Sequence, residues 1–162
     1  MKLDEKMEKA LSLQFNAEME SAFLYLSMAA WLDAHDLRGC SHWMKKQFEE
    51  EQEHAMKLYE YSVARGGRII VDAVPTPRCD WENVTAVFDQ VYAHEQKVTS
   101  LIHGLVDLAA ELKDYATSVK LDWFVNEQVE EEENSYAIVA KLKKYGEEPL
   151  ALAMLDNELS KR

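Results

Sequence analysis

The chain has 162 residues, 48 % of them hydrophobic, which is enough for one domain with a sizeable core. Its 30 acidic residues outnumber 18 basic ones, and the formal net charge of −12 argues against nucleic acid as a partner, because binding phosphates requires a basic face. Nowhere do 18 or more apolar residues follow one another, so we expect no transmembrane helix and no membrane partner.

The start of the chain, Met1–Lys6, mixes both charge signs and has no apolar run of the kind that marks a signal peptide. Cys40 and Cys79 do not form a metal-spaced pair. Two unpatterned cysteines fit a reducing compartment, and we expect a cytoplasmic protein.

The first half of the chain predicts two long helices, over about residues 4–35 and 40–66. Gly39 lies between them, and Gly66 and Gly67 follow the second. Apolar residues recur three and four positions apart in both. In the first helix these are Leu13, Ala17, Leu24, Met28 and Trp31, and in the second Phe48, Ala55, Leu58 and Tyr59.

The second half predicts helices over about residues 83–111 and 114–145, with Asn83 and Asp114 as N-caps and Gly146 just after the last turn. A short fifth helix follows over about 148–160, with Pro149 near its start.

The connections predict how these helices are arranged. Short links join the first to the second helix and the third to the fourth, which makes each pair antiparallel neighbours. The link over about 67–82 is long enough to run the length of a bundle. We therefore expect an all-α, up-down four-helix bundle over about 4–145 with one long crossover, in a single domain spanning 1–162.

An internal repeat relates the two predicted hairpins. A shift of 77 residues places Glu18 on Glu95, Glu51 on Gln128 and His54 on Glu131. Each half thus carries a lone acid on its first helix and a polar i, i+3 pair on its second, and such a pair points in one direction from a helix.

Helix geometry places these positions at a common depth. At about 1.5 Å rise per residue, Glu18, Glu51, Glu95 and Gln128 lie about 21–28 Å from the turns that join their helices. Carboxylates converging in a dry core would repel one another and take up protons. Bound cations remove that conflict, and carboxylate oxygens with a histidine nitrogen suit iron, manganese or zinc.

Several motifs together resemble the bacterial non-haem ferritins. They are Gln14-x-x-x-Glu18, Tyr25, Glu51-Gln52-Glu53-His54, His94-Glu95-Gln96 and the run from Asn126 to Glu133. The likeness covers essentially the whole chain and extends to the ferritin-like crossover and the short last helix.

The resemblance implies a di-iron ferroxidase centre inside the bundle. Glu18, Glu51 and His54 would bind one iron, and Glu51, Glu95 and Glu131 the second, with Glu51 bridging and Gln128 close by. Three further acids match the third iron site of the family, which shares Glu131, and Tyr25 matches a tyrosine expected to donate an electron. The three acids are Glu50, Glu127 and Glu130.

The resemblance also implies iron storage in a shell of twenty-four chains. Fe(II) would be oxidised by O2 or H2O2 and kept as a ferric mineral, with a possible electron donor for its release. No haem is expected, because Gln52 stands where the related bacterioferritins carry a methionine ligand, and the second hairpin has Gln128-x-x-Glu131 in place of Glu-x-x-His.

Two other functions remain open at this point. A di-iron peroxidase would oxidise iron without storing it, and a structural subunit would only nucleate mineral beside active partner chains. The remaining histidines have no partner at ligand spacing, and we interpret them as surface or interface residues. They are His35, His42, His94 and His103.

Overall fold

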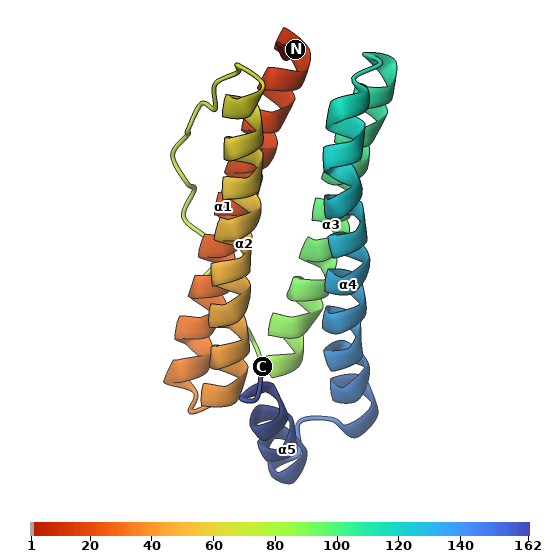
Figure 1. Cartoon of the computed structure of the whole chain (residues 1–162). Helices are drawn as coiled ribbons and strands as arrows, with labels where there is room; N and C mark the ends of the chain where they lie inside the picture. Colours follow the sequence, from red (N-terminus) through yellow and green to blue (C-terminus); the bar gives the residue numbers. More distant parts are fainter. Residues whose placement is uncertain (1) are drawn as a thin grey trace.

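Five helices make up most of residues 2–162, which are the residues that the computed structural model describes (Figure 1). They are α1 (Glu5–Ala34), α2 (Arg38–Ala64), α3 (Val84–Glu111), α4 (Tyr115–Tyr145) and α5 (Pro149–Leu159). No strand occurs over the described range, so the predicted all-α fold is confirmed. Each predicted boundary lies within two residues of the observed one.

Local side-chain chemistry sets where these helices begin and end. The predicted N-caps are confirmed, because Asn83 accepts a hydrogen bond from Ala86 N and Asp114 accepts one from Thr117 N. Gly146 ends α4 with a φ of 70°, a conformation that side chains disfavour.

Two tight turns fold the helices into hairpins. Asp36 and Lys113 both have positive φ angles, 59° and 54°, and they lie between α1 and α2 and between α3 and α4. Figure 1 shows the two hairpins side by side, with the long crossover running along the outside of the α1–α2 hairpin.

The crossover is tied to α1 by a regular ladder of hydrogen bonds. Glu8 accepts from Arg68 N at 2.8 Å, and Asn16 accepts from Asp72 N at 2.9 Å and donates to Ile70 O at 2.8 Å. Four helical residues rise about 6 Å and two extended residues about 6.6 Å, so every second residue of the crossover meets one turn of α1. This match fixes the course of the predicted crossover.

The apolar core consists of two clusters at the two halves of the bundle. On α1, for example, one cluster includes Leu11 and Phe15 and the other includes Met28 and Leu32. The predicted apolar faces were wrong at two points, because Leu13 on α1 is 58 % exposed and Tyr59 on α2 is 39 % exposed. The three- and four-residue spacing also fits the outer side of a helix, so periodicity alone did not identify the buried side.

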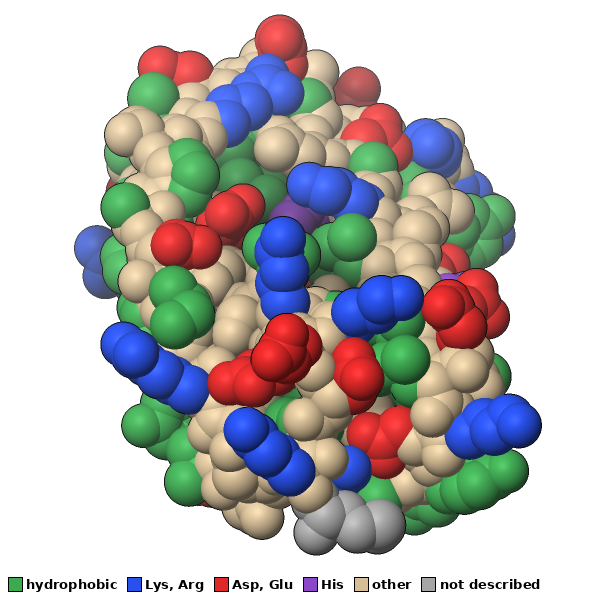
Figure 2. Space-filling model, turned by 90° about the horizontal axis from the view of Figure 1, so that it is seen from above, with side chains coloured by type: hydrophobic (Ala, Val, Ile, Leu, Met, Phe, Trp, Pro, Cys, Tyr) green, Lys and Arg blue, Asp and Glu red, His purple; other side chains and the backbone are tan. Residues whose placement is uncertain are grey.

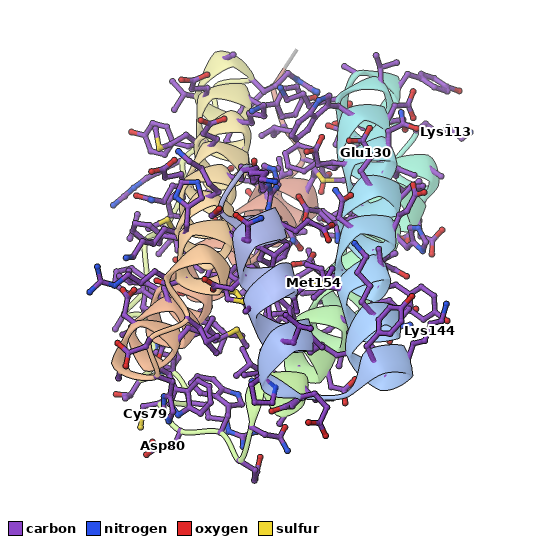
Figure 3. The ribbon with its side chains drawn as sticks, turned by 90° about the horizontal axis from the view of Figure 1, so that it is seen from below. Cys79, Asp80, Lys113, Glu130, Lys144 and Met154 are labelled. Carbon is purple, nitrogen blue, oxygen red and sulfur yellow. The ribbon has the colours of Figure 1, made fainter. Side chains whose placement is uncertain are left out.

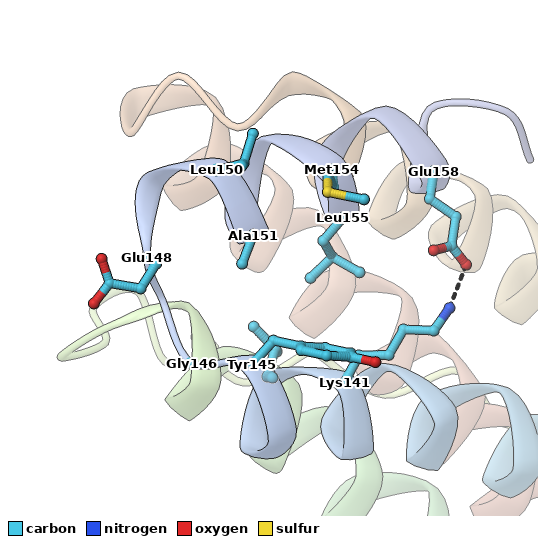
Figure 4. A pocket seen from close by; sticks show the side chains of 10 residues that line it. Lys141, Tyr145, Gly146, Glu148, Leu150, Ala151, Met154, Leu155 and Glu158 are labelled. Atoms are coloured by element: carbon cyan, nitrogen blue, oxygen red, sulfur yellow. Dashed lines mark hydrogen bonds and ion pairs between the residues drawn. The ribbon is translucent and has the colours of Figure 1, made fainter.

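The short helix α5 lies across the end of the bundle, and the view from below places it between α2 and α4 (Figure 3). Gly39 allows this close approach, because a Cβ at that position would lie 1.8 Å from Asp156 O. Asp156 Oδ1 also accepts from Cys40 N at 2.8 Å. A mainly apolar groove of about 560 Å³ remains between α4 and α5, bordered by the Lys141–Glu158 ion pair (Figure 4).

At the end of the molecule seen from above, the surface carries charges of both signs, and neither sign forms a separate patch (Figure 2). Lys and Arg side chains are interspersed there with Asp and Glu side chains (Figure 2). Among residues 2–162, no helix has both the length and the apolar character needed to cross a membrane.

Candidate metal centre

Four buried acids, one from each long helix, meet in the layer between the two apolar clusters. On every helix the predicted polar positions fall between residues of one cluster and residues of the other. Glu18, Glu51, Glu95 and Glu131 are at most 3 % exposed. Fully buried acids are rare unless they are paired or bind a cation, so this layer is the chemically unusual part of the core. We call these four acids together with His54 the metal layer.

One compact group within this layer has the geometry of a metal site. Glu18, Glu51 and His54 each offer one ligand atom, and these atoms lie within 4.8 Å of one another. His54 Nδ1 is 3.5 Å from Glu51 Oε2, as the i, i+3 spacing on α2 requires. It is the single such group among the described residues.

The donor set of this group fits a bound cation. One oxygen of Glu18 and one of Glu51, both Oε2, are buried and make no hydrogen bond within the described structure. Burying an unpaired carboxylate oxygen is costly, and a divalent cation would satisfy both at once. The oxygens and the imidazole nitrogen together suit iron, manganese or zinc.

The other two buried acids, Glu95 and Glu131, accept hydrogen bonds from neutral side chains. The Tyr25 hydroxyl donates to Glu95 Oε1, and Gln128 Nε2 donates to Glu95 Oε2 at 3.2 Å. Gln47 Nε2 donates to Glu131 Oε2 at 2.8 Å. The structure thus brings Glu95, Gln128 and Glu131 into the layer but not into the compact group.

Burial changes the acidity of these side chains. Burial raises the pKa of Glu18 and Glu51 well above the ordinary value, and neighbouring carboxyls raise both further. Burial also raises the pKa of Glu95, and burial with the nearby Glu95 carboxyl raises that of Glu131 to about 7. A cation entering this layer would therefore displace protons from it.

Tyr25 keeps its proton in the same environment. Burial raises the pKa of its hydroxyl well above 10.0, and the carboxyls of Glu95 and Glu51 act in the same direction. The neutral phenol can then donate to Glu95, and its ring is fully buried between the metal layer and the apolar cluster around Trp43.

The three acids predicted for a third iron site are less closely associated. Glu50 forms an ion pair with Arg162, at 2.6 Å, and Glu127 Oε1 lies 3.9 Å from His54 Nε2. Glu130 is exposed on α4 (Figure 3). They do not form one compact group, and their role as ligands stays a prediction.

Sequence reasoning assigned no role to two glutamines that hold the acids in place, although Gln14 stood in the Gln14-x-x-x-Glu18 motif. Gln14 Nε2 donates to Glu18 Oε1 at 2.8 Å, and Gln47 binds Glu131 from the facing hairpin. Each lies four residues before a predicted ligand, Glu18 or Glu51, and this one-turn spacing was the available signal.

His94, which we interpreted as a surface or interface residue, lies beside Tyr25 in the structure. Its Nε2 lies 2.7 Å from Ser21 Oγ, and its ring packs edge-on against Tyr25. Burial lowers its pKa to about 4, so the imidazole is neutral at physiological pH. It is a half-buried neighbour of the metal layer.

Comparisons with known proteins agree with this geometry. The model of the ferritin-like domain matches residues 8–145. A bacterial non-heme ferritin of Bacteroides fragilis is 40 % identical to this chain over 160 residues, and the match covers 99 % of both chains. A bacterial non-heme ferritin of Escherichia coli O157:H7 is 32 % identical over 158 residues, and that match covers 98 % of this chain and 96 % of the relative. An open pore ferritin of Archaeoglobus fulgidus superposes with a TM-score of 0.98 at 49 % identity, covering 99 % of this chain and 98 % of that one. With this match and the buried carboxylate–histidine layer, the chain belongs to the ferritin family.

Proposed function

We propose that this chain stores iron by binding Fe(II) inside its bundle, oxidising it and retaining the product as a ferric mineral within a cage of many chains. Its family and the compact group of Glu18, Glu51 and His54 support iron storage. The observation that most strongly supports the proposal is that one buried carboxylate oxygen of Glu18 and one of Glu51 make no hydrogen bond. A protein core tolerates such oxygens when a cation is to fill the space between them.

In this proposal the four helices supply two adjacent iron positions. Glu18 and His54 bind the first Fe(II), Glu95 and Glu131 bind the second, and Glu51 bridges the two. Gln128, which donates to Glu95, orients that carboxylate. Three acids at the side of the centre would receive a further iron on its way to the mineral, namely Glu50, Glu127 and Glu130.

The electron balance requires two irons for each oxidant. Each Fe(II) gives one electron, and O2 takes two electrons and two protons to leave as H2O2, which can take two more of each to give two waters. The carboxyls with raised pKa release protons when Fe(II) binds, so they supply part of this demand. We assign Tyr25, hydrogen-bonded to Glu95, as a one-electron donor that passes its phenolic proton to Glu95. Together with the two irons of the centre and one further iron, it makes up the four electrons that reduce O2 to two waters.

Storage needs an enclosed space, which one bundle does not provide. We propose self-association into a cage of twenty-four chains, with α5 part of the same ferritin-like domain as the bundle. Large apolar side chains that are more than half exposed supply surfaces for that assembly. They include Val71, Tyr136, Leu150 and Met154.

The test of the centre is a pair of substitutions in its compact group. Glu51→Ala with His54→Ala removes two of the three ligands, and we expect the initial rate of aerobic Fe(II) oxidation to fall at least about 100-fold, because a ligand pair is lost outright. Glu53→Ala, whose side chain is 72 % exposed on the same helix, is the matched control and should keep the rate.

An unchanged initial rate in the double variant, with normal helicity and assembly, would rule out this centre as the oxidation site. Fast oxidation by the unaltered protein, with iron retained only at its ligand sites, would instead indicate a di-iron peroxidase.

A further inference from the structure

Arg162 lies beyond the end of α5 and contacts residues of α2 next to the metal layer. Its guanidinium stacks over the Trp43 indole, with Cζ 4.9 Å from the ring centroid, and its backbone oxygen lies 3.0 Å from His42 Nε2. Figure 1 shows this end of the chain returning from α5 towards the space between the hairpins. The arginine thus lies along α2, below the predicted ligands.

The two arms of the guanidinium bind different partners on α2. Nη1 donates to Gln47 Oε1, and Nη2 donates to Glu50 Oε2 at 2.6 Å. Gln47 is fully buried, while the Arg162 side chain is 27 % exposed. A planar guanidinium presents its donors as a rigid fork, so it holds both partners in one geometry.

This contact determines how the Gln47 amide is oriented. A guanidinium has only donors, so the amide oxygen must face Arg162 and the amide nitrogen must face away. The nitrogen then donates to Glu131 Oε2 at 2.8 Å. If the amide were reversed, its NH2 group would meet the guanidinium and its oxygen would meet the carboxylate, which is unfavourable on both sides.

We propose that Arg162 is a positioning residue of the metal centre, which fixes Glu131 through Gln47 and competes with incoming cations for Glu50. The inference rests on the proposed function, in which Glu131 binds the second metal and Glu50 a further one. One side chain then connects the two positions. A cation that takes Glu50 displaces the guanidinium, and the release of Gln47 loosens Glu131.

The test is anaerobic titration of the metal-free assembled protein with Zn(II), followed by calorimetry, which measures binding without oxidation. The unaltered protein should show two phases of Zn(II) binding. The first reports binding by Glu18, Glu51 and His54, and the second depends on Glu131. We expect Arg162→Met, which keeps the packing on Trp43, to weaken the second phase by about 10-fold or more and to strengthen cation binding at Glu50, whose competing guanidinium is gone. Lys161→Met, an exposed neighbour with the same loss of charge, is the control and should leave both phases unchanged.

A second variant separates positioning from general structural damage. Gln47→Met removes the connecting amide, so it should weaken the second phase as Arg162→Met does, and the double variant should be no weaker than Gln47→Met alone. Additive losses would overturn the role assigned to Gln47, and an unchanged second phase in Arg162→Met would overturn the inference while leaving the proposed function intact. A single phase in the unaltered protein would contradict the two-metal centre and this inference together.

Discussion

At the scale of single residues, the metal layer is a set of acids whose charge the surrounding protein does not fully compensate. Glu18 and Glu51 each keep one buried oxygen that makes no hydrogen bond, while both oxygens of Glu95 accept hydrogen bonds from neutral donors. Such a core is stable either with its carboxyls protonated or with cations bound. Metal affinity and folding stability are therefore linked through the same side chains.

This linkage predicts how stability depends on pH in the metal-free protein. Glu131 has a pKa of about 7 when folded, against an ordinary value of 4.5, so the folded state binds its proton more tightly than the unfolded state. The stabilisation is fully present below about pH 4.5 and is lost as the pH rises through 7. Glu131→Gln, which stays neutral, should flatten this fall in stability between pH 4.5 and 8, as measured by chemical unfolding.

The control for that prediction is Glu133→Gln, an exposed neighbour on the same helix, which should keep the full pH dependence. An equal slope for Glu131→Gln and the unaltered protein would mean that Glu131 does not titrate in this range.

The sequence was sufficient to find the acids, because the 77-residue repeat aligns Glu18 with Glu95 and helix geometry places both at the same depth along the bundle. It did not identify Arg162, whose contact with Gln47 bridges residues 115 apart in the chain and depends on where α5 lies. Contacts of this kind follow from tertiary packing and leave no local pattern.

At the scale of helices, the position of α5 depends on a close backbone approach. Gly39 lies in the first turn of α2, although the sequence suggested that this glycine separates the two helices. A glycine is required there for packing, since its missing side chain leaves room for the Asp156 carbonyl. Capping at Asn83 and Asp114 was predictable because it acts over three residues, whereas the role of Gly39 depends on a helix more than 100 residues away.

Gly39→Ala should consequently displace α5. The added Cβ would lie 1.8 Å from Asp156 O, so the two helices must separate and the contacts of Arg162 with Gln47 are weakened. We expect a loss of about 2 kcal/mol or more in unfolding free energy and faster hydrogen exchange in α5.

Gly104→Ala is the matched comparison, because an added Cβ there has no neighbour within 4 Å. It should stabilise α3 by up to about 1 kcal/mol. Equal effects of the two substitutions would show that the approach of α5 is not tight.

At the scale of the whole molecule, each chain supplies a complete set of predicted ligands from its own four helices. Oxidation can therefore be a property of one bundle, while storage has to be a property of the assembly. Helix periodicity and the repeat predicted the bundle, because they report contacts within the chain. They carry no comparable information about contacts between chains, so the cage rests on family membership and on the exposed apolar side chains.

The most direct measurement of the central claim is an aerobic titration of the purified metal-free protein with Fe(II), with oxidation rate and soluble protein-bound iron recorded together. The account predicts rapid oxidation, an assembly of about 450 kDa from twenty-four chains of 18.7 kDa, and retention of far more iron than the ligand sites can hold. Retention that stops at two or three irons per chain, or iron that precipitates outside the protein, would contradict it.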